Sequence, residues 1–92
     1  MSNESVVLLD GTNVNKVFYT QIESQIKMRL PTLLLGNAYT AKQLCGDLFW
    51  QPLTDGERRI AGKCLVNMVE LEELPLEPVE TKHEYPKYYQ LK

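Results

Sequence analysis

The side chains best suited to chemistry in this sequence are basic and amide groups spaced along one segment. Arg59, Lys63 and Asn67 follow one another at intervals of four residues, and Arg58 lies beside the first of them. On a helix, this spacing brings side chains onto one face. Arginine binds guanine edges, asparagine binds adenine edges and lysine neutralises phosphates. This is the composition that a helix in the DNA major groove needs, and the alternative is an ordinary solvated helix face.

Further basic residues lie outside this segment, and acidic residues oppose them. Lys42 lies earlier in the chain, and Lys82 and Lys87 lie near its C-terminus. The whole chain has ten Lys and Arg against twelve Asp and Glu, a formal net charge of −2. Binding to nucleic acid therefore requires the basic side chains to gather on one face. Glutamates close to the basic residues oppose such binding: Glu70, Glu72, Glu73, Glu77, Glu80 and Glu84.

Metal binding and catalysis find little support in the sequence. Cys45, Cys64 and the single histidine, His83, show none of the paired spacings of structural zinc sites. Nucleophilic pairing of cysteine and histidine needs an accessible thiolate, and the glycines form no phosphate-binding loop. We therefore expect no metal, no cofactor, no small-molecule substrate and no enzymatic activity. Both cysteines are expected to be reduced and buried in the core.

Two helices and a short strand are expected in the first half of the chain. Apolar residues recur every four positions between about residues 15 and 30, which predicts a helix that starts at an asparagine cap and stops before Pro31. Residues 32–35 are apolar enough to add a short strand. Thr40 is expected to cap a short helix that continues to Cys45, followed by a turn and, as one alternative, a further helical turn at residues 48–50.

A longer helix is expected to carry the basic residues described first. Thr54 and Glu57 form a capping-box pattern, and the apolar residues that follow predict a helix to about Glu73. Gly62 lies in the middle of this helix, where glycine is unfavourable. It therefore indicates the close approach of another backbone, from the first helix or from a second subunit.

Strands are expected at both ends of the chain. The C-terminal part, from Leu74 to Lys92, has two strand-like arms joined by residues 81–86, with prolines that favour edge strands. At the other end, residues 6–9 are apolar and are followed by Asp and Gly, which favours either a short strand and turn or a flexible tail.

The expected order is helix, short strand, short helix, longer helix and hairpin. Over roughly Asn15 to Lys92, this order resembles the winged helix-turn-helix domain. The resemblance implies an α+β fold, a small three-helix domain with a C-terminal β-hairpin, in which residues 1–12 form an N-terminal segment and residues 13–92 a single domain. It also implies that the helix beginning at Thr54 is the recognition helix and that the hairpin is the wing. The alternative is a three-helix domain with an appended hairpin.

These patterns predict a small DNA-binding protein, a transcriptional regulator whose partner is double-stranded DNA. The residues expected to contact DNA are Arg58, Arg59, Lys63, Asn67, Lys82 and Lys87. The alternative is a protein-interaction module, or an accessory protein of a mobile element, that binds no nucleic acid. It would contact a protein partner or a second copy through its tyrosine-rich C-terminus or a strand edge. The acidic start and the lack of a long apolar run predict a cytoplasmic protein without a signal peptide or membrane span.

Overall fold

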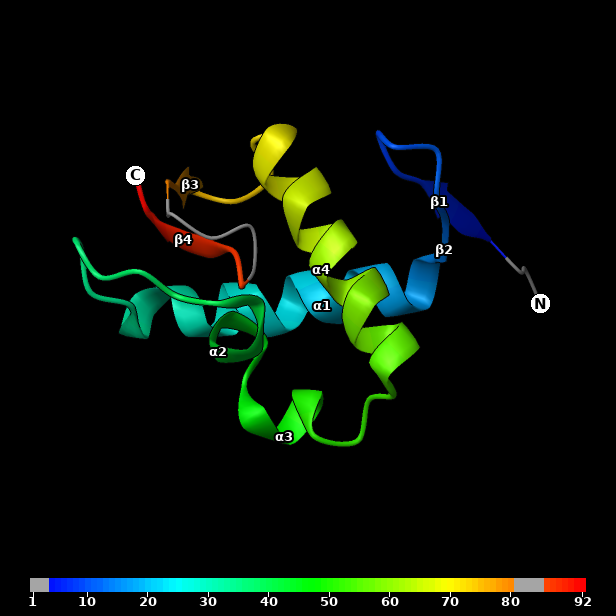
Figure 1. The fold of residues 1–92 in the computed structure, drawn as a ribbon, viewed down its shortest axis with the longest axis horizontal. Coiled ribbons are helices and arrows are strands. Elements are labelled where there is room, and N and C mark those ends of the chain that lie inside the picture. Colours follow the sequence, from blue (N-terminus) through cyan, green and yellow to red (C-terminus); the bar gives the residue numbers. More distant parts are fainter. Residues whose placement is uncertain (1–3, 81–85) are drawn as a thin grey trace.

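A computed structural model of the chain describes residues 4–80 and 86–92. It is a small α+β domain in which helices lie between an N-terminal and a C-terminal β-hairpin (Figure 1). The elements, in chain order, are β1 (Ser5–Val7), β2 (Asn13–Asn15), α1 (Lys16–Arg29), the 3-10 helix η1 (Leu30–Thr32), α2 (Ala41–Cys45), α3 (Asp47–Trp50), α4 (Asp55–Glu70), β3 (Leu76–Val79) and β4 (Tyr88–Leu91).

Side-chain caps determine where the helices begin. The Asn15 side chain accepts hydrogen bonds from two backbone N–H groups in the first turn of α1, at 2.8 and 3.3 Å. Thr40 and Gln43 form a capping box at the start of α2, and Thr54 and Glu57 form another at the start of α4. These three starts confirm the sequence prediction, because each cap bonds to atoms only two or three residues away.

Several boundaries differ from those that the sequence predicts. Residues 30–32 form η1, and residues 33–35 form no strand, so the expected strand at 32–35 is wrong. The helix α4 ends at Glu70 rather than near Glu73, because Glu72 adopts the left-handed conformation with φ of 59°. The described part of the chain also contains α3 in addition to the three expected main helices, at the position of the alternative helical turn of residues 48–50.

Both hairpins are antiparallel. In the N-terminal hairpin Val6 lies opposite Val14, and in the C-terminal hairpin β3 pairs along its length with β4. The segment before α2 joins the C-terminal hairpin through a bridge between Tyr39 and Tyr89, whose backbone groups exchange hydrogen bonds of 2.7 and 2.8 Å. The segment at Tyr39, β4 and β3 therefore lie side by side in that order.

The core lies where α4 crosses α1, as Figure 1 shows. Fully buried side chains include Ile22 and Ile26 of α1 and Leu65 of α4. Cys45 and Cys64 are also free and completely buried, as expected. The N-terminal hairpin adds Leu8 and Val14 to the same core, so the described part of the chain before position 13 contributes to the packed structure. None of the helices in residues 4–80 and 86–92 is long and apolar enough to span a membrane.

Candidate nucleic-acid interface

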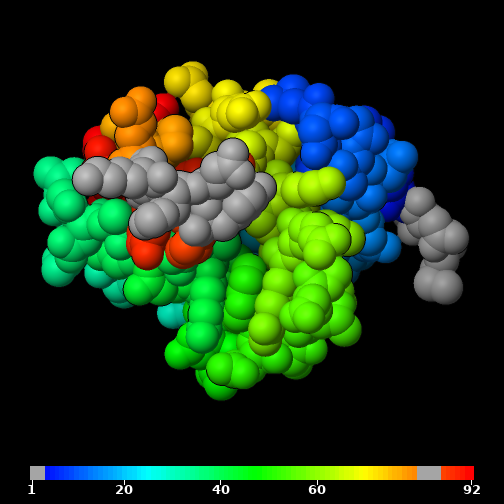
Figure 2. Space-filling model, in the orientation of Figure 1, coloured from blue at the N-terminus to red at the C-terminus, as the bar shows by residue number. Residues whose placement is uncertain are grey.

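One face of α4 lines a groove of about 1000 Å³. The turn of the N-terminal hairpin, residues 8–10, contributes to its lining, together with residues of α2 and α3 and the start of β4. Figure 2 shows this side of the molecule, with α4 in yellow and light green between the N-terminal hairpin in blue and β4 in red. The groove therefore brings together segments from the whole length of the chain.

The outer face of α4 supplies the groove with Arg59, Gly62, Lys63, Val66 and Glu70. These residues recur at intervals of three and four, which places them on one side of the helix. The opposite side is the apolar stripe that packs into the core. The amphipathic pattern of α4 is therefore the reason that its basic residues point into the groove.

Charge in the groove is opposite in sign to the charge of the chain. Among the described residues, five basic side chains and three acidic ones line it, a net of +2, whereas the whole chain carries −2. All other residues of the chain together therefore carry −4. The basic residues are Lys42, Arg58, Arg59, Lys63 and Lys87, and the acidic ones are Asp10, Asp55 and Glu70.

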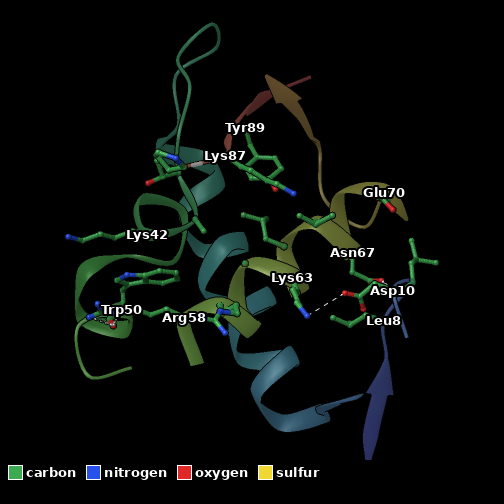
Figure 3. Close-up of a pocket in the computed structure, with 18 of the residues that line it drawn as sticks. Leu8, Asp10, Lys42, Trp50, Arg58, Lys63, Asn67, Glu70, Lys87 and Tyr89 are labelled. Carbon is green, nitrogen blue, oxygen red and sulfur yellow. Dashed lines mark hydrogen bonds and ion pairs between the residues drawn. The ribbon is translucent and has the colours of Figure 1, made fainter. Parts of the chain in front are cut away.

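Arg58 is held in place by the turn between α3 and α4. Its guanidinium donates to the backbone oxygen of Trp50, from Nε and Nη2 at 3.4 Å, and to that of Gln51 at 3.1 Å. It also lies 5.9 Å from the centre of a Trp50 ring, within the range of a cation–π contact (Figure 3). Arg58 therefore satisfies carbonyl groups at the end of α3 and fixes that helix against α4.

Lys63 reaches across the groove to the N-terminal hairpin. Its Nζ lies 3.7 Å from Asp10 Oδ2 and 3.4 Å from Thr12 Oγ1 (Figure 3). Hydrogen bonds from Thr12, followed by the charge of Lys63, hold the pKa of Asp10 below its usual value, so this carboxylate is ionised at neutral pH. Because both side chains are about half exposed, at 45% and 50%, the pair is weak and water competes with it.

Arg59 is an available cation of this face, as is Lys42 of α2. The Arg59 side chain is exposed, and within residues 4–80 and 86–92 it makes no hydrogen bond or ion pair. Lys87, immediately before β4, lines the same groove. Lys82, the other expected wing residue, and His83 lie outside the described residues.

Asn67 borders the groove but is not available to a ligand. It is only 5% exposed. Its Oδ1 accepts from the backbone N–H of Leu9 at 2.8 Å, and its Nδ2 donates to the Tyr19 hydroxyl at 3.1 Å. The Tyr19 hydroxyl in turn donates to Glu73 Oε1 at 2.8 Å. The amide therefore joins three segments inside the protein.

The rotation of the helix explains why Asn67, against the sequence prediction, is not on the same exposed face as Arg59 and Lys63. Each residue turns about 100° around the axis, so Asn67 lies about 80° away from Arg59, although the spacing is two intervals of four. This rotation carries Asn67 out of the basic face and beneath the N-terminal hairpin. A set of residues at strict four-residue spacing drifts around a helix, and its last member has left the face that the first one occupies.

The sequence did not predict that residues 8–10 pack beside α4 and line the groove. The available signal was the apolar pair Leu8 and Leu9 directly before an Asp-Gly turn, which is typical of a hairpin that packs on a core. Leu8 is 4% exposed and Leu9 is 61% exposed, so one anchors the hairpin and the other faces outward at the groove.

No group of His, Cys, Asp or Glu side chains in the described part of the chain is arranged to hold a metal ion. No family model, curated protein or solved structure matches the chain. The interpretation of the groove therefore rests on its own residues.

Proposed function

We propose that this protein binds double-stranded DNA through the groove face, with α4 as the recognition helix. The observation that carries the proposal is the gathering of five basic side chains from α2, α4 and the approach to β4 on one face of an acidic chain. Binding to the phosphate backbone depends on such a local positive surface rather than on the net charge of the protein.

The order of elements supports a winged-helix arrangement for this surface. The bridge between Tyr39 and Tyr89 adds the segment before α2 to the C-terminal hairpin, as the first strand of a winged-helix sheet does. The helices α2 and α3 precede α4, and the hairpin follows it. In this arrangement α4 enters the major groove, while Lys87 lies on the wing beside a phosphate.

The residues then divide into two roles. Arg59 and Lys63 on α4, with Lys87 and Lys42 beside them, contact DNA. Arg58 supports the surface instead, because its hydrogen bonds hold α3 against α4. The proposed function is DNA binding without catalysis, by a small cytoplasmic transcriptional regulator.

Fluorescence anisotropy with a labelled duplex of mixed sequence tests the proposal. With about three or four phosphate contacts, the affinity should fall by roughly 40- to 150-fold between about 50 and 200 mM salt. The double variant R59A/K63A should weaken binding at least tenfold and flatten the salt dependence. A matched control, K27A/K92A, removes the same charge from side chains outside the groove.

Two results would overturn the proposal. The first is no binding of the duplex by the wild-type protein even at low salt, where electrostatic attraction is strongest. The second is equal weakening in R59A/K63A and K27A/K92A, because it would show that only the total charge matters and not the groove face.

A protein-interaction module is the second candidate, and exposed apolar side chains favour it. Met28 is 70% exposed, Leu34 63% and Leu35 76%. The loop after α1 that carries both leucines projects from the body of the molecule (Figure 1). By contrast, Tyr89 of the C-terminal cluster is 4% exposed, so this tyrosine offers little surface to a partner. Light scattering on the wild-type protein and on L34S/L35S tests whether this loop joins two copies.

A further inference from the structure

Within residues 4–80 and 86–92, no contact explains why position 62 is glycine. It lies in the middle of α4, where glycine is among the least favourable residues. Its backbone φ is not positive, unlike that of Gly11, Gly36 and Gly46. A Cβ atom added at Gly62 would have no atom within 4 Å from the described residues, apart from its chain neighbours and the backbone of its own helix. The expectation that the first helix approaches this glycine is therefore wrong, and no described part of the fold requires it.

The surroundings of Gly62 point outward to a ligand instead. Gly62 lines the groove, with Arg59 one turn before it and Val66 one turn after it on the same face of α4. Without a side chain at this position, the backbone of α4 is open to close approach between the two. The groove at this point is thus basic on one side of Gly62 and apolar on the other.

We propose that Gly62 is the point where α4 comes closest to a base pair in the major groove, and that Arg59 is the side chain that selects the base. This inference rests on the proposed DNA-binding function. Among the basic residues of α4, Arg59 suits this role because the other two have partners within the protein. Arg58 donates hydrogen bonds to Trp50 and Gln51, and Lys63 forms an ion pair with Asp10. Its planar guanidinium pairs with the O6 and N7 atoms of guanine, and Val66 offers an apolar contact for a thymine methyl.

The test begins with selection of preferred duplexes from a random-sequence library by the wild-type protein. Anisotropy titrations then compare the selected duplex with a mixed-sequence duplex for the variants G62A and R59K. G62A should raise Tm by roughly 4–8 °C, because alanine stabilises the helix. It should nevertheless weaken binding of the selected duplex at least tenfold, because the added methyl group occupies the space of the base pair, and weaken binding of the mixed-sequence duplex by a smaller factor.

The second variant separates base selection from charge. R59K keeps the positive charge, so its affinity for the mixed-sequence duplex should fall less than that of R59A, which removes the charge. Lysine can also donate to guanine O6 and N7, but its ammonium lacks the planar fork of arginine, so the preference for guanine at the selected position should fall severalfold. A selected site without guanine, or full discrimination by R59K, would overturn the role of Arg59.

The matched control for Gly62 is Gly56, the other glycine of α4. It does not line the groove, and a Cβ there would make only an ordinary contact with Thr54 Oγ1 at 3.9 Å. G56A should bind the selected duplex like the wild type. Equal affinities of G62A and G56A would overturn the inference, and so would a library that yields no preferred sequence although mixed-sequence DNA is bound. A wild-type protein that binds no duplex at all would instead reject the proposed function itself.

Discussion

Replacing Asn67 by alanine should destabilise the fold without touching the proposed DNA contacts. The Asn67 side chain accepts from the N–H of Leu9 in the N-terminal hairpin and donates to the hydroxyl of Tyr19 in α1. In N67A the Leu9 N–H loses its acceptor and Tyr19 loses a donor, although Tyr19 still donates to Glu73. The hairpin then loses a direct hydrogen bond to α4.

The loss of unfolding free energy in N67A can be estimated from these hydrogen bonds. A donor left without its partner in a partly buried place costs about 1–3 kcal/mol. Taking about 2 kcal/mol as the central value, a domain of this size should lose roughly 8–16 °C in Tm. Because the Tyr19 and Asn67 side chains bond to one another at 3.1 Å, the effects of Y19F and N67A should not be additive.

Thermal and urea unfolding, followed by far-UV circular dichroism, measure this change. N37A is the matched control, because Asn37 is exposed and its side chain makes no hydrogen bond within the described residues, so its unfolding free energy should change by less than about 0.5 kcal/mol. If N67A is as stable as N37A, the amide does not hold the hairpin and the reasoning is refuted. If N67A binds DNA more weakly while the variant is as stable as the wild type, Asn67 contacts DNA instead of holding the hairpin.

Three further predictions concern buried groups and the backbone. Burial raises the pKa of Cys45 to about 12 and that of Cys64 to about 11. Neither thiol should therefore react with a thiol reagent near neutral pH in the folded protein, and both should react in denaturant. A thiol that reacts rapidly in the native state would contradict this. Burial also raises the pKa of Tyr19 to about 12, so the unfolded chain releases protons that the folded protein retains. The free energy of unfolding should therefore be highest below about pH 9 and fall as the pH rises towards 12, and an unchanged urea midpoint between about pH 8 and 11 would refute it. Gly46 has φ of 90° and packs against the Arg29 guanidinium, so G46A should lower the free energy of unfolding by about 1–3 kcal/mol in urea titrations, whereas G36A, at φ of 91° but in open space, should lose less.

Local signals made much of the fold predictable. The caps at Asn15, Thr40 and Thr54 are hydrogen bonds within two or three residues, and the helices that follow them begin where the sequence predicts. The apolar periodicity of α1 and α4 likewise identified the buried faces, including Cys64. The prediction of a strand at residues 32–35 is wrong, because an apolar run forms a strand only when a partner strand is available. Here β4 pairs with the segment at Tyr39 instead.

The composition of the basic surface was thus determined by the sequence, because Arg59 and Lys63 follow an amphipathic period that any helix at this place would display. Tertiary structure decided how those side chains are used. Arg58 is bound to the end of α3, Lys63 meets Asp10, and Asn67 lies beneath a hairpin that begins more than fifty residues earlier in the chain. The physical reason is the range of the interaction: a cap or a helix face depends on neighbours within one turn, whereas a buried amide or a groove depends on partners that only the folded chain brings together.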